Sequence, residues 1–234
     1  TKLGDRIHLK TDIVGLRRAN GGVMVKLKGQ GDVWFDKVVM AAHADQSLAL
    51  IEDATPLEHE LLGTFGFQRN HAVLHSDASL MPKRRGAWAA WNYVSEAAVS
   101  ASHGVGGNAW KGESSPPSDL CLTYWMNRLQ SIDRAYPLYE TLNPVRMPAA
   151  ALIHGEFDYR HPVFDAKAIA MQPRLAEIQG HNGLFFAGAW TGFGFHEDGL
   201  KSAVAIAKTL GVEIPWETKV AAFEKSSEPM QGIA

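Results

Sequence analysis

Four glycines lie close together near the C-terminal end of the chain, at Gly188, Gly192, Gly194 and Gly199. Because glycine has no Cβ, a flat ring or a phosphate can approach the backbone closely at each of them. The last of the four falls where a helix is predicted to begin, and a helix start presents unpaired N–H groups and the positive end of the helix dipole. This spacing suits the binding of an electron-rich ligand edge. An ordinary strand-to-helix turn is the alternative that spacing alone leaves open.

The elements that must position these glycines are a strand, a turn and a helix. Residues 183–190 are an apolar run that predicts a buried strand. The turn occupies 191–195, and the helix is predicted to begin at His196 or Glu197 and to end at Gly211. The glycines therefore belong to one strand, turn and helix unit.

Residues 184–203 read LFFAGAWTGFGFHEDGLKSA and resemble the C-terminal flavin motif of the flavin-containing amine oxidases. The resemblance implies FAD as cofactor and six residues beside it. Three would lie near the ribityl chain and the ring: Gly188, Ala189 and Trp190. Three would lie at the helix start, near flavin N1 and the C2 carbonyl: Glu197, Asp198 and Gly199. Reduced flavin carries negative charge at N1 and C2=O, which a helix N-terminus stabilises.

The beginning of the chain carries a second part of the resemblance. Three strands are predicted at 7–14, 23–27 and 33–40, separated by glycine-containing turns, and they form a meander. This segment resembles the part of the flavoenzyme family that covers the adenine, which implies that the backbone of Ile13 contacts adenine. A plain meander with an inward Ile13 is the alternative.

The family opens with a strand and a G-x-G-x-x-G turn for the FAD pyrophosphate, and no such unit is found in this sequence. The similar string at 104–109 follows a Ser- and Ala-rich stretch and is interpreted as a loop. The chain also begins at Thr1 without a signal peptide. We therefore expect the C-terminal part of a flavoenzyme, inactive alone, with the missing N-terminal segment as a candidate partner.

The fold expected is mixed α/β, an incomplete Rossmann-type FAD domain interleaved with a mixed-sheet substrate domain. Residues 1–44 and 181–214 are assigned to the FAD domain, 45–180 to the substrate domain and 215–234 to a tail. Residues 95–118 are predicted to be a loop. Further helices are predicted at 46–52, 56–62, 120–132 and from Asp165 onward, and further strands at 72–75 and 87–93.

The resemblance is strongest to a bacterial and plant branch of amine-oxidase-like NAD/FAD-binding proteins, through residues 43–46 and 81–93. Members of that branch accompany cyclopropane fatty acid synthases, which implies a small-molecule or lipid substrate such as a fatty acyl chain. Pocket walls are predicted at Trp91, Tyr93 and Trp190. The catalytic residue stays unassigned, because strand 70–77 has no lysine to face flavin N5.

The composition restricts partners and location. The net charge is −2 with scattered basic residues, so no nucleic-acid partner is expected. The longest apolar stretches are far shorter than a membrane span needs, and no transmembrane segment is predicted. The single Cys121 fits a reducing compartment, and we expect a cytoplasmic protein. No metal site is predicted, because no regular helix over 155–160 would align His154, Asp158 and His161.

The functional prediction is an FAD-dependent oxidoreductase that passes a hydride from an organic substrate to flavin N5. A non-catalytic truncated flavoprotein module is one alternative, supported by the absent pyrophosphate turn. A flavin-dependent fatty acid isomerase or desaturase is another, favoured by the absent lysine. An NAD-only oxidoreductase has least support, because no complete dinucleotide fingerprint is present.

Overall fold

The computed structural model describes residues 3–95 and 120–217, and these fall into two compact units. Unit 1 comprises residues 1–66 and 162–234, and unit 2 comprises Phe67–His161. None of the helices in the described residues is long and apolar enough to cross a membrane. Six short 3₁₀ turns join the larger elements: η1 (Gly4–Arg6), η2 (Ala78–Leu80), η3 (Arg85–Ala87), η4 (Ala150–Leu152), η5 (Gln172–Glu177) and η6 (Ala189–Thr191).

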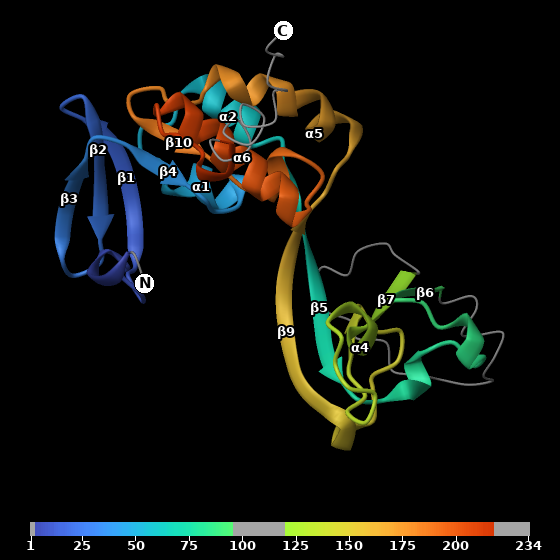
Figure 1. Ribbon diagram of the computed structural model, residues 1–234. Coiled ribbons are helices and arrows are strands. Elements are labelled where there is room, and N and C mark those ends of the chain that lie inside the picture. Colours follow the sequence, from blue (N-terminus) through green and yellow to red (C-terminus); the bar gives the residue numbers. More distant parts are fainter. Residues whose placement is uncertain (1–2, 96–119, 218–234) are drawn as a thin grey trace, which may run out of the picture. The chain divides into compact units, whose positions relative to one another are not determined.

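Unit 1 begins with an antiparallel three-stranded sheet in the order β1-β2-β3, shown side by side in Figure 1. The strands are β1 (Ile13–Ala19), β2 (Gly22–Leu27) and β3 (Gly31–Phe35). Asn20 and Gly21 both have positive φ, as a two-residue hairpin requires. The meander is confirmed, but the expected first strand at 7–14 is wrong. η1 precedes it, and the positive φ of Lys10 breaks any extended run before Ile13.

The third expected strand is two strands. After β3, the chain continues as β4 (Val38–Met40), which pairs in parallel with β10 (Leu184–Phe186). The β4–β10 pair is a two-stranded sheet. On the other side of β10, the Gln179 side chain accepts from the Phe186 N–H at 2.9 Å and donates to the Phe186 carbonyl at 2.8 Å. A glutamine amide thus takes the place of a neighbouring strand there.

Unit 1 has four helices that lie wholly within the described residues: α1 (Ala44–Leu50), α2 (Pro56–Leu62), α5 (Ala166–Met171) and α6 (His196–Thr209). α2 begins where predicted, with Thr55 as N-cap and Pro56 in the first turn. α1 begins two residues before the expected Gln46, because the Gln46 side chain accepts from the His43 N–H and closes the first turn there. α5 follows the Asp165 cap as expected.

Unit 2 is a five-stranded sheet in the order β6-β7-β8-β5-β9. Its strands are β5 (Phe67–His75), β6 (Trp91–Ser95), β7 (Leu120–Trp125), β8 (Tyr139–Leu142) and β9 (Ile153–Pro162). The helix expected over 120–132 is wrong: β7 takes its first half, and only α4 (Met126–Leu129) is helical. Cys121 and Thr123 are buried while Leu122 and Tyr124 are less so, which is strand alternation, and pairing on both sides of β7 outweighs helix propensity. The strand expected at 87–93 begins only at Trp91, after η3.

The two faces of the unit 2 sheet differ. One face is buried and contains Asn92, Thr123, Thr141, Val73, His75 and Tyr139. The opposite face is called the open face below. Its residues either pair with one another across the strands or follow such residues by strand alternation. They are Trp91, Tyr93, Leu122, Tyr124, Glu140, Leu142, Ala72, Leu74 and Asn70, and the last strand's Ala72 and Asn70 are buried. Trp91 and Tyr93 are 47% and 62% exposed on it.

The compact units do not divide the chain at 44/45 and 180/181, where domain boundaries were expected. The segment after β4 packs back onto the meander: Leu16 bridges to Ile51, and the Glu52 N–H donates to the Leu16 carbonyl. Arg18 of β1 pairs with both Asp53 and Glu58. α1 and α2 are thereby part of unit 1. The assignment of segments to flavin and substrate stays a prediction, and most of the expected tail lies outside the described residues.

Candidate functional site

The candidate site in unit 1 is the turn between β10 and α6. Gly188, two residues after β10, has φ +150°, and a Cβ there would lie 2.7 Å from the Trp190 indole. Its N–H donates to Ser202 Oγ at 3.0 Å, and that hydroxyl donates to the Gly199 carbonyl at 2.7 Å. Only glycine fits position 188 without moving the indole. Ser202 therefore ties the turn to the first turns of α6.

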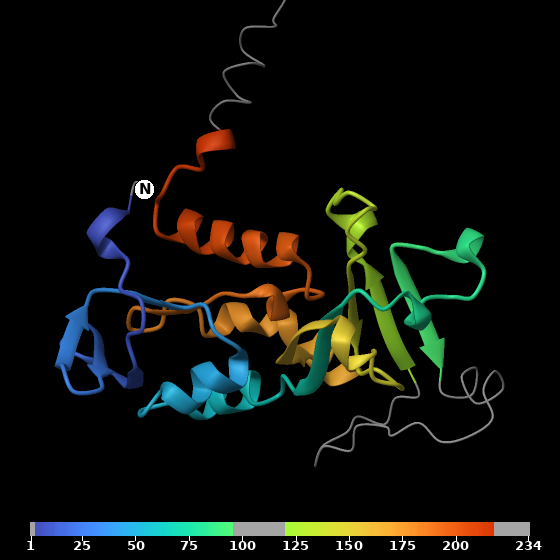
Figure 2. The same cartoon turned by 90° about the horizontal axis from the view of Figure 1, so that it is seen from below.

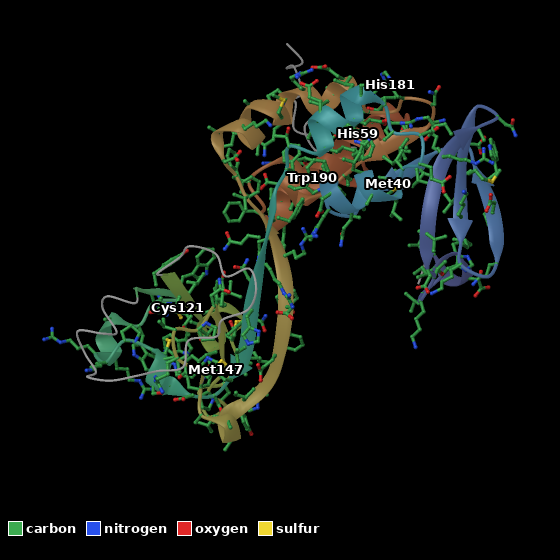
Figure 3. All side chains as sticks on the ribbon, turned by 180° about the vertical axis from the view of Figure 1, so that it is seen from behind. Met40, His59, Cys121, Met147, His181 and Trp190 are labelled. Carbon is green, nitrogen blue, oxygen red and sulfur yellow. The ribbon has the colours of Figure 1, made fainter. Side chains whose placement is uncertain are left out.

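Trp190, labelled in Figure 3, is buried within unit 1. Its Nε1 donates to the Ala42 carbonyl at 3.1 Å, and its ring meets Phe65 edge to face at 4.8 Å between centroids. Gln172 Nε2 donates to the Trp190 carbonyl at 3.3 Å and to the Gly192 carbonyl at 2.5 Å. The buried indole therefore holds the turn in place.

Asp198 closes the glycine-rich loop. Its Oδ2 accepts from the N–H groups of Phe193 and Phe195, each at 3.0 Å. A Cβ at Gly192 would lie 2.6 Å from the Asp198 carboxylate, so glycine is required for this close approach. The carboxylate therefore points back into its own loop. Among the described residues its neighbour Glu197 has no side-chain partner, and it lies in the acidic first turn of α6.

The N-terminus of α6 keeps unpaired backbone donors. The N–H groups of Asp198 and Gly199 both donate to the Phe195 carbonyl. Within the described ranges, the N–H groups of His196 and Glu197 have no acceptor. α6, the helix that Figure 2 draws in orange-red before the C-terminal segment, is 14 residues long. The positive end of its dipole lies at this N-terminus and strengthens the attraction of the two N–H groups for a negative group. The arrangement can hold an electron-rich ligand edge.

Gly199 lies beside Ala189 in this arrangement. A Cβ built on Gly199 would lie 3.7 Å from the Ala189 nitrogen, which is an ordinary contact. The fold thus brings η6 and the start of α6 together. Ile13 lies elsewhere in unit 1, on β1 opposite Leu27 and 47% exposed. Trp91 and Tyr93 lie in unit 2.

Sequence reasoning missed the two side chains that hold the turn, Ser202 and Gln172. A serine three residues after a helix-start glycine is a detectable signal, because its hydroxyl can reach the glycine carbonyl one turn back. Gln172 lies 20 positions before Gly192, and no local pattern indicates that pairing.

The β9 residues whose types could bind a metal ion are not brought together: His154, Asp158 and His161. Asp158 accepts from Arg69 at 2.7 Å, and His161 Nδ1 lies 2.7 Å from Asn70 Nδ2. His154 and Asp158 share one strand face and His161 takes the other, by alternation. The Arg69 hydrogen bond lowers the pKa of Asp158. Among the described residues no group of three His, Cys, Asp or Glu side chains could hold a metal ion.

Buried polar groups cross the covered face of the unit 2 sheet. His75 Nδ1 accepts from the Asp77 N–H at 3.1 Å, so its proton lies on Nε2, which is 2.8 Å from Thr141 Oγ1. Thr141 Oγ1 is 2.9 Å from Thr123 Oγ1. Burial lowers the pKa of His75 to about 4, with His154 adding to the effect against the raising influence of Asp77. Burial also raises the pKa of the Cys121 thiol. Neither group is activated for chemistry near neutral pH.

Comparisons with known proteins give a fold. No family model and no curated protein sequence matches the chain. Among solved structures, the CLA-producing fatty acid isomerase from P. acnes is similar with a TM-score of 0.55 and 15% identity, over 85% of this chain and 47% of that one. Cyclohexylamine oxidase from Brevibacterium oxydans matches with a TM-score of 0.51 and 13% identity, over 88% and 50% of the two chains. Putrescine oxidase bound to putrescine matches with 0.53 and 9%, over 90% and 50%.

The chain thus has the mixed α/β fold of FAD-dependent oxidoreductases. It spans about half the length of the solved structures it matches. At these identities the likeness establishes the fold alone.

Proposed function

We propose that this chain is the flavin-ring half of an FAD-dependent oxidoreductase. The observation that carries the proposal is the pair of unpaired N–H groups at His196 and Glu197, at the start of a 14-residue helix and joined through Ser202 to the Gly188 turn. The comparison with FAD-dependent oxidoreductases of the same fold supports it.

The residues present fit a flavin. Gly199 offers a surface without a side chain, and the two free donors match the acceptor edge at N1 and C2=O. When bound, FAD accepts a hydride or its equivalent from an organic substrate. We assign a part in cofactor binding to Gly188, Ala189, Trp190, Glu197, Asp198, Gly199 and Ile13.

Two of these assignments take a specific form. Asp198 would act by fixing the amides of Phe193 and Phe195, because its carboxylate is already engaged there. Trp190 would act by holding the turn in place, because its indole is buried against Phe65. The role of both residues is to position the backbone, and the N-terminus of α6 supplies the electrostatic field.

The open face of unit 2 is the proposed substrate surface, with Trp91 and Tyr93 as its exposed aromatic walls. Such a surface suits an organic substrate with an apolar part, such as a lipid or a fatty acyl chain. A segment that carries a turn for the FAD pyrophosphate is the proposed partner that completes the cofactor site.

A flavin-dependent fatty acid isomerase or desaturase is the second candidate. No lysine occurs in strands β5 to β9 as the structure describes them, so these strands supply no amine to face flavin N5. One of the matched folds belongs to a fatty acid isomerase.

The test is the visible absorption spectrum of the purified chain, made alone and joined to the coding sequence upstream of it. Flavin bands that co-purify with the longer form and disappear in Gly188→Val support the proposal. Stoichiometric flavin retained by Gly188→Val contradicts the assigned site, and no flavin in either form favours a non-catalytic module.

A further inference from the structure

Two segments of unit 2 that meet at the end of β7 carry five basic residues. Residues 82–90 hold three of them and residues 126–137 hold the other two: Lys83, Arg84, Arg85, Arg128 and Arg134. All five are exposed, and they are called the basic cluster below. The same two segments contain one acidic residue, Asp133, whereas the whole chain has a net charge of −2. The basic cluster is therefore a local excess of positive charge.

Two tryptophan rings lie among these side chains. Trp88 and Trp125 meet edge to face, with ring centroids 5.3 Å apart and ring planes at 89°. The Arg85 guanidinium lies 5.2 Å from the centre of the Trp88 ring, and the Arg134 guanidinium lies 5.6 Å from the centre of the Trp125 ring. Arg128 Nη1 donates to the Trp88 carbonyl at 3.4 Å. Three guanidinium groups are thus gathered around one pair of rings.

Hydrogen bonds fix the two segments. Trp88 Nε1 donates to the Pro82 carbonyl at 2.8 Å, and the Trp125 N–H donates to the Ala90 carbonyl at 2.9 Å. The buried Asn127 side chain bonds four backbone groups of the segment after α4, those of Ile132, Asp133, Tyr136 and Leu138. The two rings are therefore in place before any partner binds.

No carboxylate among the described residues forms an ion pair with the basic cluster. Asp133 is exposed, and its carboxylate accepts from the Ala135 N–H at 2.9 Å. Guanidinium groups held close together repel one another, and an anionic partner would relieve that repulsion. The cluster is thus suited to bind negative charge.

The surroundings of the charges indicate the kind of partner. Because every basic residue of the cluster is exposed, an extended surface fits it better than a single small anion. Apolar side chains lie next to the charges in sequence: Leu129 is 44% exposed and Tyr136 is 73% exposed. A bilayer with anionic headgroups offers both kinds of contact, because phosphate binds guanidinium groups and aromatic side chains prefer the membrane interface. A nucleic acid fits less well, because Arg85 and Arg134 lie over the rings on which bases would stack.

We propose that the basic cluster docks unit 2 onto a membrane surface that contains anionic phospholipids. The guanidinium groups bind lipid phosphates, and the exposed Leu129 and Tyr136 enter the interface. Trp125 pairs with Tyr139, which belongs to the covered face of the sheet, so docking does not use the open face. The proposal therefore stands apart from the proposed redox function.

The experiment is co-sedimentation of the purified chain with vesicles. One set contains phosphatidylcholine alone, and the other contains phosphatidylcholine with phosphatidylglycerol. We expect binding to the anionic vesicles to be at least about tenfold tighter, since several basic residues act together at the charged surface. Added salt should weaken this binding steeply, because it screens the attraction between exposed charges.

Variants identify the surface that binds. Arg85→Gln with Arg134→Gln should weaken binding to anionic vesicles by about tenfold or more, because two charges are lost. Arg85→Lys with Arg134→Lys keeps the charge and should restore most of the binding. The matched control, Arg17→Gln with Lys28→Gln, removes two charges from exposed positions of unit 1 and should bind as the parent does. Tyr136→Ser should weaken vesicle binding a few-fold, because it removes an exposed ring.

Four outcomes would overturn the proposal. They are equal binding to both kinds of vesicle, equal losses in the Arg85, Arg134 variant and its control, tighter binding to a single-stranded oligonucleotide than to anionic vesicles, and release from vesicles by excess glycerol 3-phosphate at constant ionic strength. The last would assign the cluster to a single phosphate group. The comparisons of vesicles, oligonucleotide and glycerol 3-phosphate use the unaltered chain, so they decide the matter even where a variant fails to fold. None of them depends on flavin.

Discussion

The backbone N–H of Gly188 donates to the hydroxyl of Ser202, 14 positions later in the chain, at 3.0 Å. This bond joins the end of the buried strand to the second turn of α6, and the same hydroxyl donates to the Gly199 carbonyl. The turn and the helix start are therefore held in one relative position before any ligand arrives.

Ser202→Ala removes both bonds and leaves the Gly188 N–H without its partner. We expect a loss of about 1–2 kcal/mol in the free energy of unfolding, the usual cost of an unsatisfied buried donor. Urea denaturation followed by circular dichroism measures it. Thr209→Ala, which removes an exposed hydroxyl bond near the other end of α6, should change stability by less than about 0.5 kcal/mol. Equal losses in the two variants would show that Ser202 has no special role.

Gly188→Ala and Gly199→Ala should act in opposite directions on stability. At position 188 the Cβ meets the Trp190 indole at 2.7 Å and φ is +150°, so we expect a loss of about 1–3 kcal/mol. At position 199 the Cβ has room, and alanine in place of a helical glycine favours folding by up to about 1 kcal/mol.

The same Gly199→Ala variant tests the cofactor assignment. If the flavin ring approaches this glycine, the added methyl should weaken flavin binding in the joined form although the fold is more stable. Flavin content per protein, read from the ratio of visible to ultraviolet absorbance, measures this. Full flavin content in Gly199→Ala would remove that residue from the proposed cofactor contacts.

Arg18→Leu should destabilise unit 1 strongly. Glu58 is almost fully buried and pairs with Arg18, so losing the guanidinium leaves a buried carboxylate whose remaining partner is Thr55. We expect a loss of about 3–5 kcal/mol. Lys26→Leu removes the half-exposed pair with Glu52 and should cost less than about 1 kcal/mol. The double variant Arg18→Leu, Glu58→Leu should recover much of the loss, and a further drop there would contradict this account.

The stability of unit 2 should fall in acid because of His75. Its pKa is about 4 in the fold against 6.5 when exposed, so the unfolded chain binds the proton first as the pH falls. The contribution is fully present above about pH 6.5 and decreases by up to about 3 kcal/mol towards pH 4. Denaturation midpoints between pH 7.5 and 4.5 measure the decrease, and His75→Gln should flatten it. An unchanged slope in that variant would assign the acid sensitivity to other groups.

Much of unit 1 could be predicted from sequence because its signals are local. Thr55, Pro56 and Glu58 mark the start of α2, and the glycines with Gly211 mark the turn and the end of α6. The structure places the predicted helix start at His196.

Unit 2 could be predicted less well because its signals are not local. The segment after Leu120 has apolar residues at spacings that fit a helix, yet its strand pairing comes from β6 and β8. The pairing of Trp91 with Tyr124, and of Tyr124 with Glu140, depends on the register between three strands, which no local pattern indicates.

The short parallel sheet of unit 1 bears on how the chain behaves in concentrated solution. Gln179 closes the far side of β10, but no described residue pairs with the outer side of β4, where Val39 is 43% exposed. An uncovered, apolar strand edge is a template for pairing with another chain. We therefore expect the chain to self-associate through Val38–Met40 during purification. A charged residue in place of Val39 should suppress this association.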